Sequence, residues 1–183
     1  GFDMTDFLDN ADIRTPVMQY LFHRIDQLLT GERMIICIDE FWKALGDEAF
    51  RGLAQDGLKT YRKQNAFMVF GTQSPADALR LIESHHFALV LQDMNFSRQT
   101  SGEEGLELLR RIKSLRPRLP VVLMTAWGSI ALAVEGMKRG ASDFLTKPWT
   151  NAHVLSSVET ALALARAPAP AASTRRELDR TFP

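Results

Sequence analysis

The sequence predicts an α/β fold, built as a doubly wound parallel sheet with helices on both faces. Five short apolar runs along the 183 residues have the length and β-branching of strands. The stretches between the runs repeat apolar residues at helical spacing, so strand and helix alternate along the chain. A chain of this length can also bury a substantial core. Alternation of this kind is typical of parallel α/β sheets.

The five expected strands differ in sequence but share an apolar centre and a polar residue at or near the end. The first of them, MIICIDEF, is expected to be a buried strand because of its length and its β-branched residues. The predicted strands cover residues 34–41, 66–73, 87–94, 121–126 and 143–147.

Helix boundaries are indicated by capping residues, prolines and glycines. Thr15-Pro16 and Ser74-Pro75 each combine an N-cap residue with a proline suited to the first helical turn. Gly140 is typical of the residue that follows a helix end. The predicted helices cover residues 15–30, 47–64, 74–83, 106–115, 130–139 and 151–165.

Composition and charge restrict the classes of partner. Lysine plus arginine number 22, as do aspartate plus glutamate, so no net charge draws the chain to nucleic acid or to a membrane surface. The N-terminal stretch is acidic, without the apolar core of a signal peptide, and no apolar run approaches 18 residues. We therefore expect a cytoplasmic protein that contacts neither nucleic acid nor membrane directly.

Three polar residues stand at the ends of the third, fourth and fifth expected strands: Asp93, Thr125 and Lys147. In an open parallel sheet the carboxyl ends of the strands share one edge, and ligands bind in the crevice there. A carboxylate, a hydroxyl and an ammonium group at one edge suit a phosphoryl group together with a divalent cation. We expect Asp93 to be the nucleophile, with Thr125 and Lys147 contacting the phosphoryl oxygens.

A divalent cation at this edge would be Mg²⁺, which prefers carboxylate, carbonyl and water oxygens. Asp39 and Glu40 end the first expected strand and form the acidic pair placed to share the metal with Asp93. The main-chain carbonyl of Asn95 is expected to supply a further oxygen.

The stretch from about residue 74 to 165 resembles the receiver domain of bacterial response regulators. The resemblance rests on LVLQDMNF, VVLMTAWGS and GASDFLTKPW, and LAVEGMKRGASDFLTKPW is most similar to receivers of enhancer-binding activators. It implies the flavodoxin-like strand order 2-1-3-4-5 and phosphorylation of Asp93 by a histidine kinase in two-component signalling or a phosphorelay. It also implies that Thr125 and Phe144 switch together and signal to an output domain or protein. Such a phosphoprotein is an acceptor rather than a turnover enzyme, and the resemblance leaves open whether it forms a homodimer.

Residues 1–80 resemble a different family. IDEFWK and the later TQS are similar to the Walker B region of type IV secretion ATPases. The two resemblances meet at about residues 71–80, so the chain resembles a chimera. No G-x-x-x-x-G-K-[ST] loop occurs in the sequence. Two alternatives to the phosphoacceptor therefore stand: an inactive secretion-ATPase fragment, and a folded chimera with neither activity.

The expected domain organisation has three parts. Residues 1–33 are an N-terminal extension with an amphipathic helix, and residues 166–183 are an Ala/Pro-rich linker and tail. The receiver-like α/β domain covers residues 34–165, secretion-ATPase-like over 34–80 and receiver-like over 74–165.

Overall fold

The computed structural model describes residues 10–39, 60–95, 102–126 and 130–167. The chain divides into two compact units, Gly1–Leu81 and Ile82–Pro183. Each unit is considered by itself. The predicted division into an extension, a domain and a tail stays a prediction. Within the described ranges no helix is long and apolar enough to span a bilayer.

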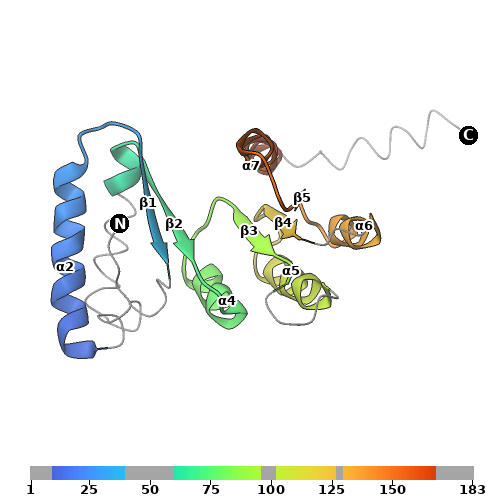
Figure 1. Ribbon diagram of the computed structural model, residues 1–183, viewed down its shortest axis with the longest axis horizontal. Helices are drawn as coiled ribbons and strands as arrows, with labels where there is room; N and C mark the ends of the chain where they lie inside the picture. The colour runs from blue at the N-terminus through green and yellow to red at the C-terminus, as the bar shows by residue number, and fades with distance from the viewer. Residues whose placement is uncertain (1–9, 40–59, 96–101, 127–129, 168–183) are drawn as a thin grey trace, which may run out of the picture. The chain divides into compact units, whose positions relative to one another are not determined.

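The first unit combines a long helix with a pair of parallel strands (Figure 1). Helix α2 covers Ala11–Leu28, strand β1 covers Met34–Asp39 and strand β2 covers Ala66–Gly71. Residues 60–63 are helical, and the rest of the helix predicted at 47–64 lies outside the described residues. The buried apolar side chains of this part are Met18, Phe22, Ile36, Ile38, Tyr61 and Ala66.

The N-terminal boundary of α2 corrects the sequence prediction. The helix begins at Ala11 instead of following Thr15, and its N-cap is Asn10, whose side chain accepts a hydrogen bond from the amide of Asp12. Pro16 therefore lies inside the helix. The physical reason is that Asn10 is an equally good cap upstream, and a proline in the second turn removes only one helical hydrogen bond.

Strands β1 and β2 pair in parallel register along their whole length, from Met34 opposite Ala66 to Asp39 opposite Gly71. Their side chains alternate between buried and exposed, so β1 is not the fully buried strand that its apolar sequence predicted. Ile36 and Ile38 are buried, whereas one face remains open to solvent. That exposed face carries Ile35, Cys37, Phe67 and Val69.

Helix α4, Pro75–Ser84, begins as predicted, because the Ser74 hydroxyl accepts a hydrogen bond from the amide of Asp77. The boundary between the two units falls within this helix. The second unit then alternates strand and helix in the predicted order. Its elements are β3 (Val90–Asp93), α5 (Glu103–Leu115), β4 (Val121–Thr125), α6 (Ile130–Lys138), β5 (Asp143–Thr146) and α7 (Asn151–Arg166).

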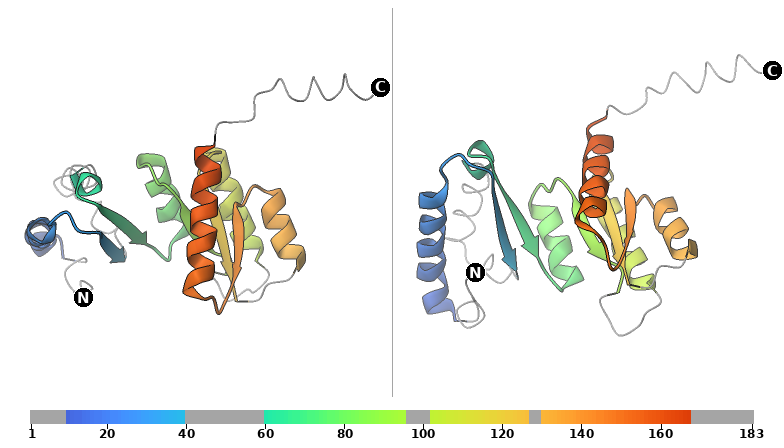
Figure 2. Two further views of the ribbon diagram at one scale, coloured as in Figure 1. Left: turned by 90° about the horizontal axis from the view of Figure 1, so that it is seen from above. Right: turned by 45° about the horizontal axis from the view of Figure 1, so that its top comes forward.

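The sheet of the second unit has the order β3-β4-β5, with both pairs parallel. Helix α7 lies on one face, and helices α5 and α6 lie on the other (Figures 1 and 2). On the α7 face, Val122 and Leu145 pack with Ala161 of the helix. On the opposite face, Gly136 of α6 lies against Leu123. Helices on both faces are what a doubly wound sheet requires.

The α/β class and the parallel pairing are therefore confirmed, while the strands are divided over two sheets. The first sheet holds β1 and β2, and the second holds β3, β4 and β5, where a single five-stranded sheet was predicted. The neighbours β2-β1 and β3-β4-β5 agree with the predicted order. Strands β1 and β2 pair over all six residues within the first unit, and β3, β4 and β5 pair within the second.

Candidate functional site

The carboxyl edge of the second sheet carries the three predicted site residues. Strand β3 ends at Asp93, β4 ends at Thr125, and Lys147 follows the last residue of β5. Beyond the paired strands, the amide of Lys147 donates to the carbonyl of Thr125 at 2.7 Å, and the amide of Met94 donates to that of Met124 at 2.8 Å. The ladder thus continues to the site and fixes the backbone on which these side chains stand.

The side chains of Asp93 and Lys147 form an ion pair between Oδ2 and Nζ, although 54 residues separate them in sequence. The second carboxylate oxygen of Asp93 accepts the amide of Asn95 at 3.1 Å. About a third of each side chain remains exposed, 34% for Asp93 and 38% for Lys147. A carboxylate that is both oriented and accessible can act as a nucleophile, with the neighbouring ammonium compensating the charge that a phosphoryl group brings.

Thr125 differs from the other two because it is fully buried. The side-chain amide of Asn95 donates to its hydroxyl oxygen at 3.3 Å, so Asn95 contacts Asp93 through its main chain and Thr125 through its side chain. From the sequence, only the main-chain carbonyl of Asn95 is expected to take part in the site. The residue's position two after Asp93, in a polar stretch, was the available signal for a role of its side chain.

The end of β3 is held by close packing against helix α5. The side chain of Gln92, which is buried, donates to the carbonyl of Gly105 at 2.7 Å. A Cβ atom on Gly105 would lie 2.8 Å from the main-chain Cα and oxygen atoms of Met94. Only glycine fits at this approach, so the backbone next to Asp93 has little freedom to shift.

The segment after β5 adds an aromatic residue to the site. The Nζ atom of Lys147 lies 5.8 Å from the centre of the Trp149 ring, within the range of a cation–π interaction. The peptide bond between Lys147 and Pro148 is cis. Phe144, the predicted partner of Thr125, is half-buried in β5 and lies opposite Leu123 in the register. The coupling of Phe144 to Thr125 stays a prediction.

This arrangement of strand ends agrees with a comparison against protein families. The family model of the response regulator receiver domain matches residues 51–159, more than half of the chain. The chain belongs to this family. The match begins earlier than the stretch that the sequence motifs indicated, and it extends over both compact units of the receiver chain.

The receiver chain also matches curated proteins of another kind over a shorter length. It is 62% identical over 85 residues to the type IV secretion system protein VirB4 of Bartonella quintana, and 52% identical over 79 residues to VirB4 of Brucella abortus. These matches cover 46% and 43% of this chain, and 11% and 10% of the relatives. The chain thus spans about a tenth of their length, and a receiver segment is joined to a VirB4-like segment, as predicted.

Among solved structures, a CheY-like receiver domain protein from Methanospirillum hungatei is similar, with 22% identity and a TM-score of 0.48. The match covers 73% of this chain and 95% of that one. A response regulator protein from Burkholderia pseudomallei matches with 22% identity and a TM-score of 0.45, over 83% of this chain and 76% of the other.

The second unit carries two of the oxygen donors that were predicted to bind the metal. The Asp93 carboxylate and the main-chain carbonyl of Asn95 are hard oxygen donors of the kind that Mg²⁺ binds together with waters and a phosphoryl oxygen. In the described ranges no three His, Cys, Asp or Glu side chains gather into a metal cluster. The donors that are present fit Mg²⁺, with waters and a phosphoryl oxygen completing its coordination shell.

Asp39 and Glu40, the predicted acidic pair, belong to the first unit of the chain. Asp39 ends β1 in the first unit, where its carboxylate lies over Gly71 of β2: a Cβ atom on Gly71 would be 2.6 Å from its Oδ1. Glu40 lies outside the described residues. Their part in binding a metal therefore stays a prediction.

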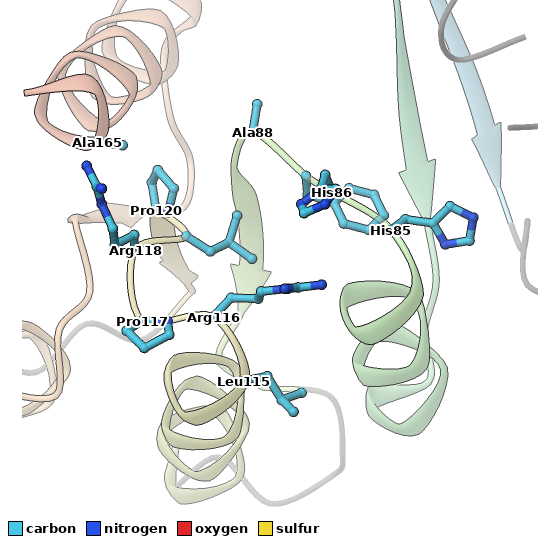
Figure 3. A pocket seen from close by; sticks show the side chains of 11 residues that line it. His85, His86, Ala88, Leu115, Arg116, Pro117, Arg118, Pro120 and Ala165 are labelled. Carbon is cyan, nitrogen blue, oxygen red and sulfur yellow. The ribbon is translucent and has the colours of Figure 1, made fainter. Parts of the chain in front are cut away.

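A cavity of about 680 Å³ lies at the opposite edge of the sheet, where the chain enters β3 and β4 (Figure 3). It is lined by residues 85–88, residues 115–120 and Ala165. The guanidinium group of Arg116 crosses the gap and donates to the carbonyls of Ile82 and Glu83 at 3.3 and 3.1 Å. This arginine therefore caps the end of α4, and the cavity is not part of the Asp93 site.

Proposed function

We propose that the chain is a phosphoacceptor of two-component signalling, in which Asp93 receives the phosphoryl group with Mg²⁺ as cofactor. The observation that carries the proposal is the ion pair between Asp93 and Lys147 at the end of a sheet whose next strand ends in Thr125. The membership of the receiver family supports it. A histidine kinase would be the donor, and an output domain or protein would receive the signal.

In the proposed reaction, a carboxylate oxygen of Asp93 attacks phosphorus, and the bond from phosphorus to the donor's leaving group breaks. The negative charge on the phosphoryl oxygens is compensated by Lys147, and Mg²⁺ supplies further compensation when bound. Asp93 and the carbonyl of Asn95 would hold the metal, with Asp39 and Glu40 as the predicted additional carboxylates. The Thr125 hydroxyl would donate to a phosphoryl oxygen.

The test is phosphoryl uptake from acetyl phosphate in the presence of Mg²⁺, followed by intact mass. The full chain is expected to gain one phosphoryl group, and Asp93→Asn is expected to gain none. Asp143→Asn is the matched control, because Asp143 begins β5 at the other end of the same sheet. Absence of uptake in a chain that circular dichroism shows to be folded would refute the phosphoacceptor proposal.

The same assay tests the predicted acidic pair. Asp39→Asn is expected to raise the Mg²⁺ concentration needed for half-maximal uptake, because a carboxylate that binds the metal contributes to its affinity. An unchanged Mg²⁺ requirement in Asp39→Asn, with uptake still lost in Asp93→Asn, would remove Asp39 from the metal site and leave the phosphoacceptor function intact.

The similarity to VirB4 favours one alternative, an ATPase-derived assembly segment without nucleotide turnover. In this alternative Asp39 and Glu40 are the remnant of a Walker B pair. The two functions differ in whether the chain accepts a phosphoryl group. Uptake from acetyl phosphate that depends on Asp93 supports the receiver, whereas a folded chain that takes up no phosphoryl group and releases no phosphate from ATP is the result expected of the inactive segment.

A further inference from the structure

Asn95 contacts two of the three predicted site residues, Asp93 and Thr125, through separate groups. Its main-chain amide donates to the carboxylate of Asp93, and its side-chain amide donates to the hydroxyl oxygen of Thr125. The main chain of Asn95 is therefore tied to the nucleophile, and its side chain is tied to the hydroxyl. A substitution that removes the side chain leaves the first contact available and removes the second.

The side chain of Asn95 is held in an arrangement that does not satisfy all of its polar atoms. Its Oδ1 is buried, and no hydrogen-bond partner lies within reach among the described residues. A buried acceptor without a donor is costly, since it has lost water without a replacement. A second arrangement that gives Oδ1 a donor or returns it to water therefore competes with the one described.

The hydroxyl of Thr125 is shielded from water. Its side chain is fully buried, at 0% exposure, and its strand is packed between helices on both faces. Its hydroxyl oxygen accepts the amide of Asn95 at 3.3 Å, near the long end of the hydrogen-bonding range. Such a long hydrogen bond can be given up when a change of rotamer lets the hydroxyl donate a stronger, charge-assisted bond to an anion.

From these observations we propose that the Asn95 side chain is a resting-state latch: it holds the Thr125 hydroxyl until that hydroxyl turns to donate its hydrogen to a phosphoryl group on Asp93. Asn95 is then a positioning residue, because it acts on the phosphorylated state through Thr125. The proposal rests on the proposed function of Asp93. It assigns to the Asn95 side chain a role separate from that of its main-chain carbonyl, and the latch opposes phosphorylation.

The latch predicts that Asn95→Ala binds beryllofluoride, a mimic of the phosphoryl group, more tightly in the presence of Mg²⁺. The dissociation constant is expected to fall about two- to tenfold, the range to which one neutral hydrogen bond corresponds. It can be measured from the NMR shift of the Lys147 amide, which donates to Thr125. Asn151→Ala, an exposed asparagine at the start of α7, is the matched control and is expected to bind as the unaltered chain does.

A double-mutant cycle separates the latch from a merely structural role. In a Thr125→Ala background no hydroxyl remains to be held, so Asn95→Ala is expected to leave the beryllofluoride affinity unchanged. A structural role would weaken binding in both backgrounds. Equal or weaker binding in Asn95→Ala alone, beside an unaltered chain that responds to beryllofluoride, overturns the latch and spares the phosphoacceptor function.

A second measurement needs no phosphoryl mimic. Scalar couplings of Thr125 in the resting protein are expected to show one dominant χ1 rotamer, and Asn95→Ala is expected to populate a second. An unchanged rotamer distribution in Asn95→Ala overturns the latch, whatever the behaviour of Asp93. If the unaltered chain neither takes up phosphoryl groups nor binds beryllofluoride, the proposed function fails, and the latch fails with it.

Discussion

Two glycines on helices of the second unit provide a sharp test of how the site is held. Gly105 in α5 and Gly136 in α6 are both buried, and replacing either by alanine adds a single Cβ atom. At Gly105 this atom would lie 2.8 Å from main-chain atoms of Met94, the residue after Asp93. At Gly136 its close neighbour would be a terminal methyl group of Leu123, at 2.6 Å.

The two contacts differ in what can move. A side-chain methyl group can be displaced by a change of rotamer, whereas the main chain of Met94 is fixed by its hydrogen bond to Met124. Overpacking costs about 1–3 kcal/mol, and alanine in a helix interior gains up to about 1 kcal/mol over glycine. We therefore expect Gly105→Ala to lose about 1–2 kcal/mol of unfolding free energy, and Gly136→Ala to stay within about 1 kcal/mol of the unaltered chain.

Thermal unfolding followed by circular dichroism measures the difference. For a unit of this size 1 kcal/mol corresponds to a shift in Tm of about 4–8 °C, so Gly105→Ala should unfold clearly below Gly136→Ala. Because Met94 adjoins the nucleophile, Gly105→Ala should also slow phosphoryl uptake while Gly136→Ala does not. Equal stability of the two variants would refute the reasoning that the backbone beside Asp93 cannot yield.

Three other predictions follow from single contacts. Lys147→Met is expected to change the unfolding free energy by less than about 1 kcal/mol, because the ion pair with Asp93 is about one-third exposed. The same variant is expected to reduce phosphoryl uptake strongly. Uptake that falls only because the chain unfolds would contradict the role of Lys147 at the phosphoryl site. Gln92→Leu removes a buried amide whose Oε1 has no partner in the described structure, so the unfolding free energy measured in urea should change by less than about 1 kcal/mol. Gln92→Glu buries a charge instead and should lower the unfolding free energy several times more. Burial, together with a hydrogen bond to Asp26, raises the pKa of Tyr61 above its ordinary value of 10.0. The folded state then keeps a proton that the unfolded chain loses, so the stability from Tyr61 is present below pH 10.0 and is lost as pH rises further. Urea midpoints of Tyr61→Phe should lack this part of the alkaline decline, and an identical decline would disprove it.

The carboxyl edge of the second sheet was predictable because it depends on order along the chain. Parallel strands that alternate with helices must end on one side, so Asp93, Thr125 and Lys147 had to approach one another once the strand ends were located. The ion pair between Asp93 and Lys147 is consistent with that expectation. The side-chain contact of Asn95 with Thr125 depends on the rotamer chosen under tertiary packing, which no local pattern specifies.

Helix starts show where local patterns reach their limit. Ser74-Pro75 and Thr15-Pro16 both combine an N-cap residue with a proline, but only the first pair opens a helix at the expected residue. Upstream of Pro16, Asn10 offers a competing cap, and the longer helix buries Met18 and Phe22 all the same. The predicted burial of β1 is wrong for a related reason. An apolar run indicates a strand, but whether each face of that strand is covered depends on how other elements pack against it.

The open face of the first sheet affects how strongly copies of the chain associate with one another. Ile35, Phe67 and Val69 leave between 42% and 60% of their surface in water, on neighbouring parallel strands. Such a surface favours association between copies, and the extent of this association grows with concentration. A polar substitution at Ile35, Phe67 or Val69 would weaken this contribution without altering Asp93, which belongs to the other unit.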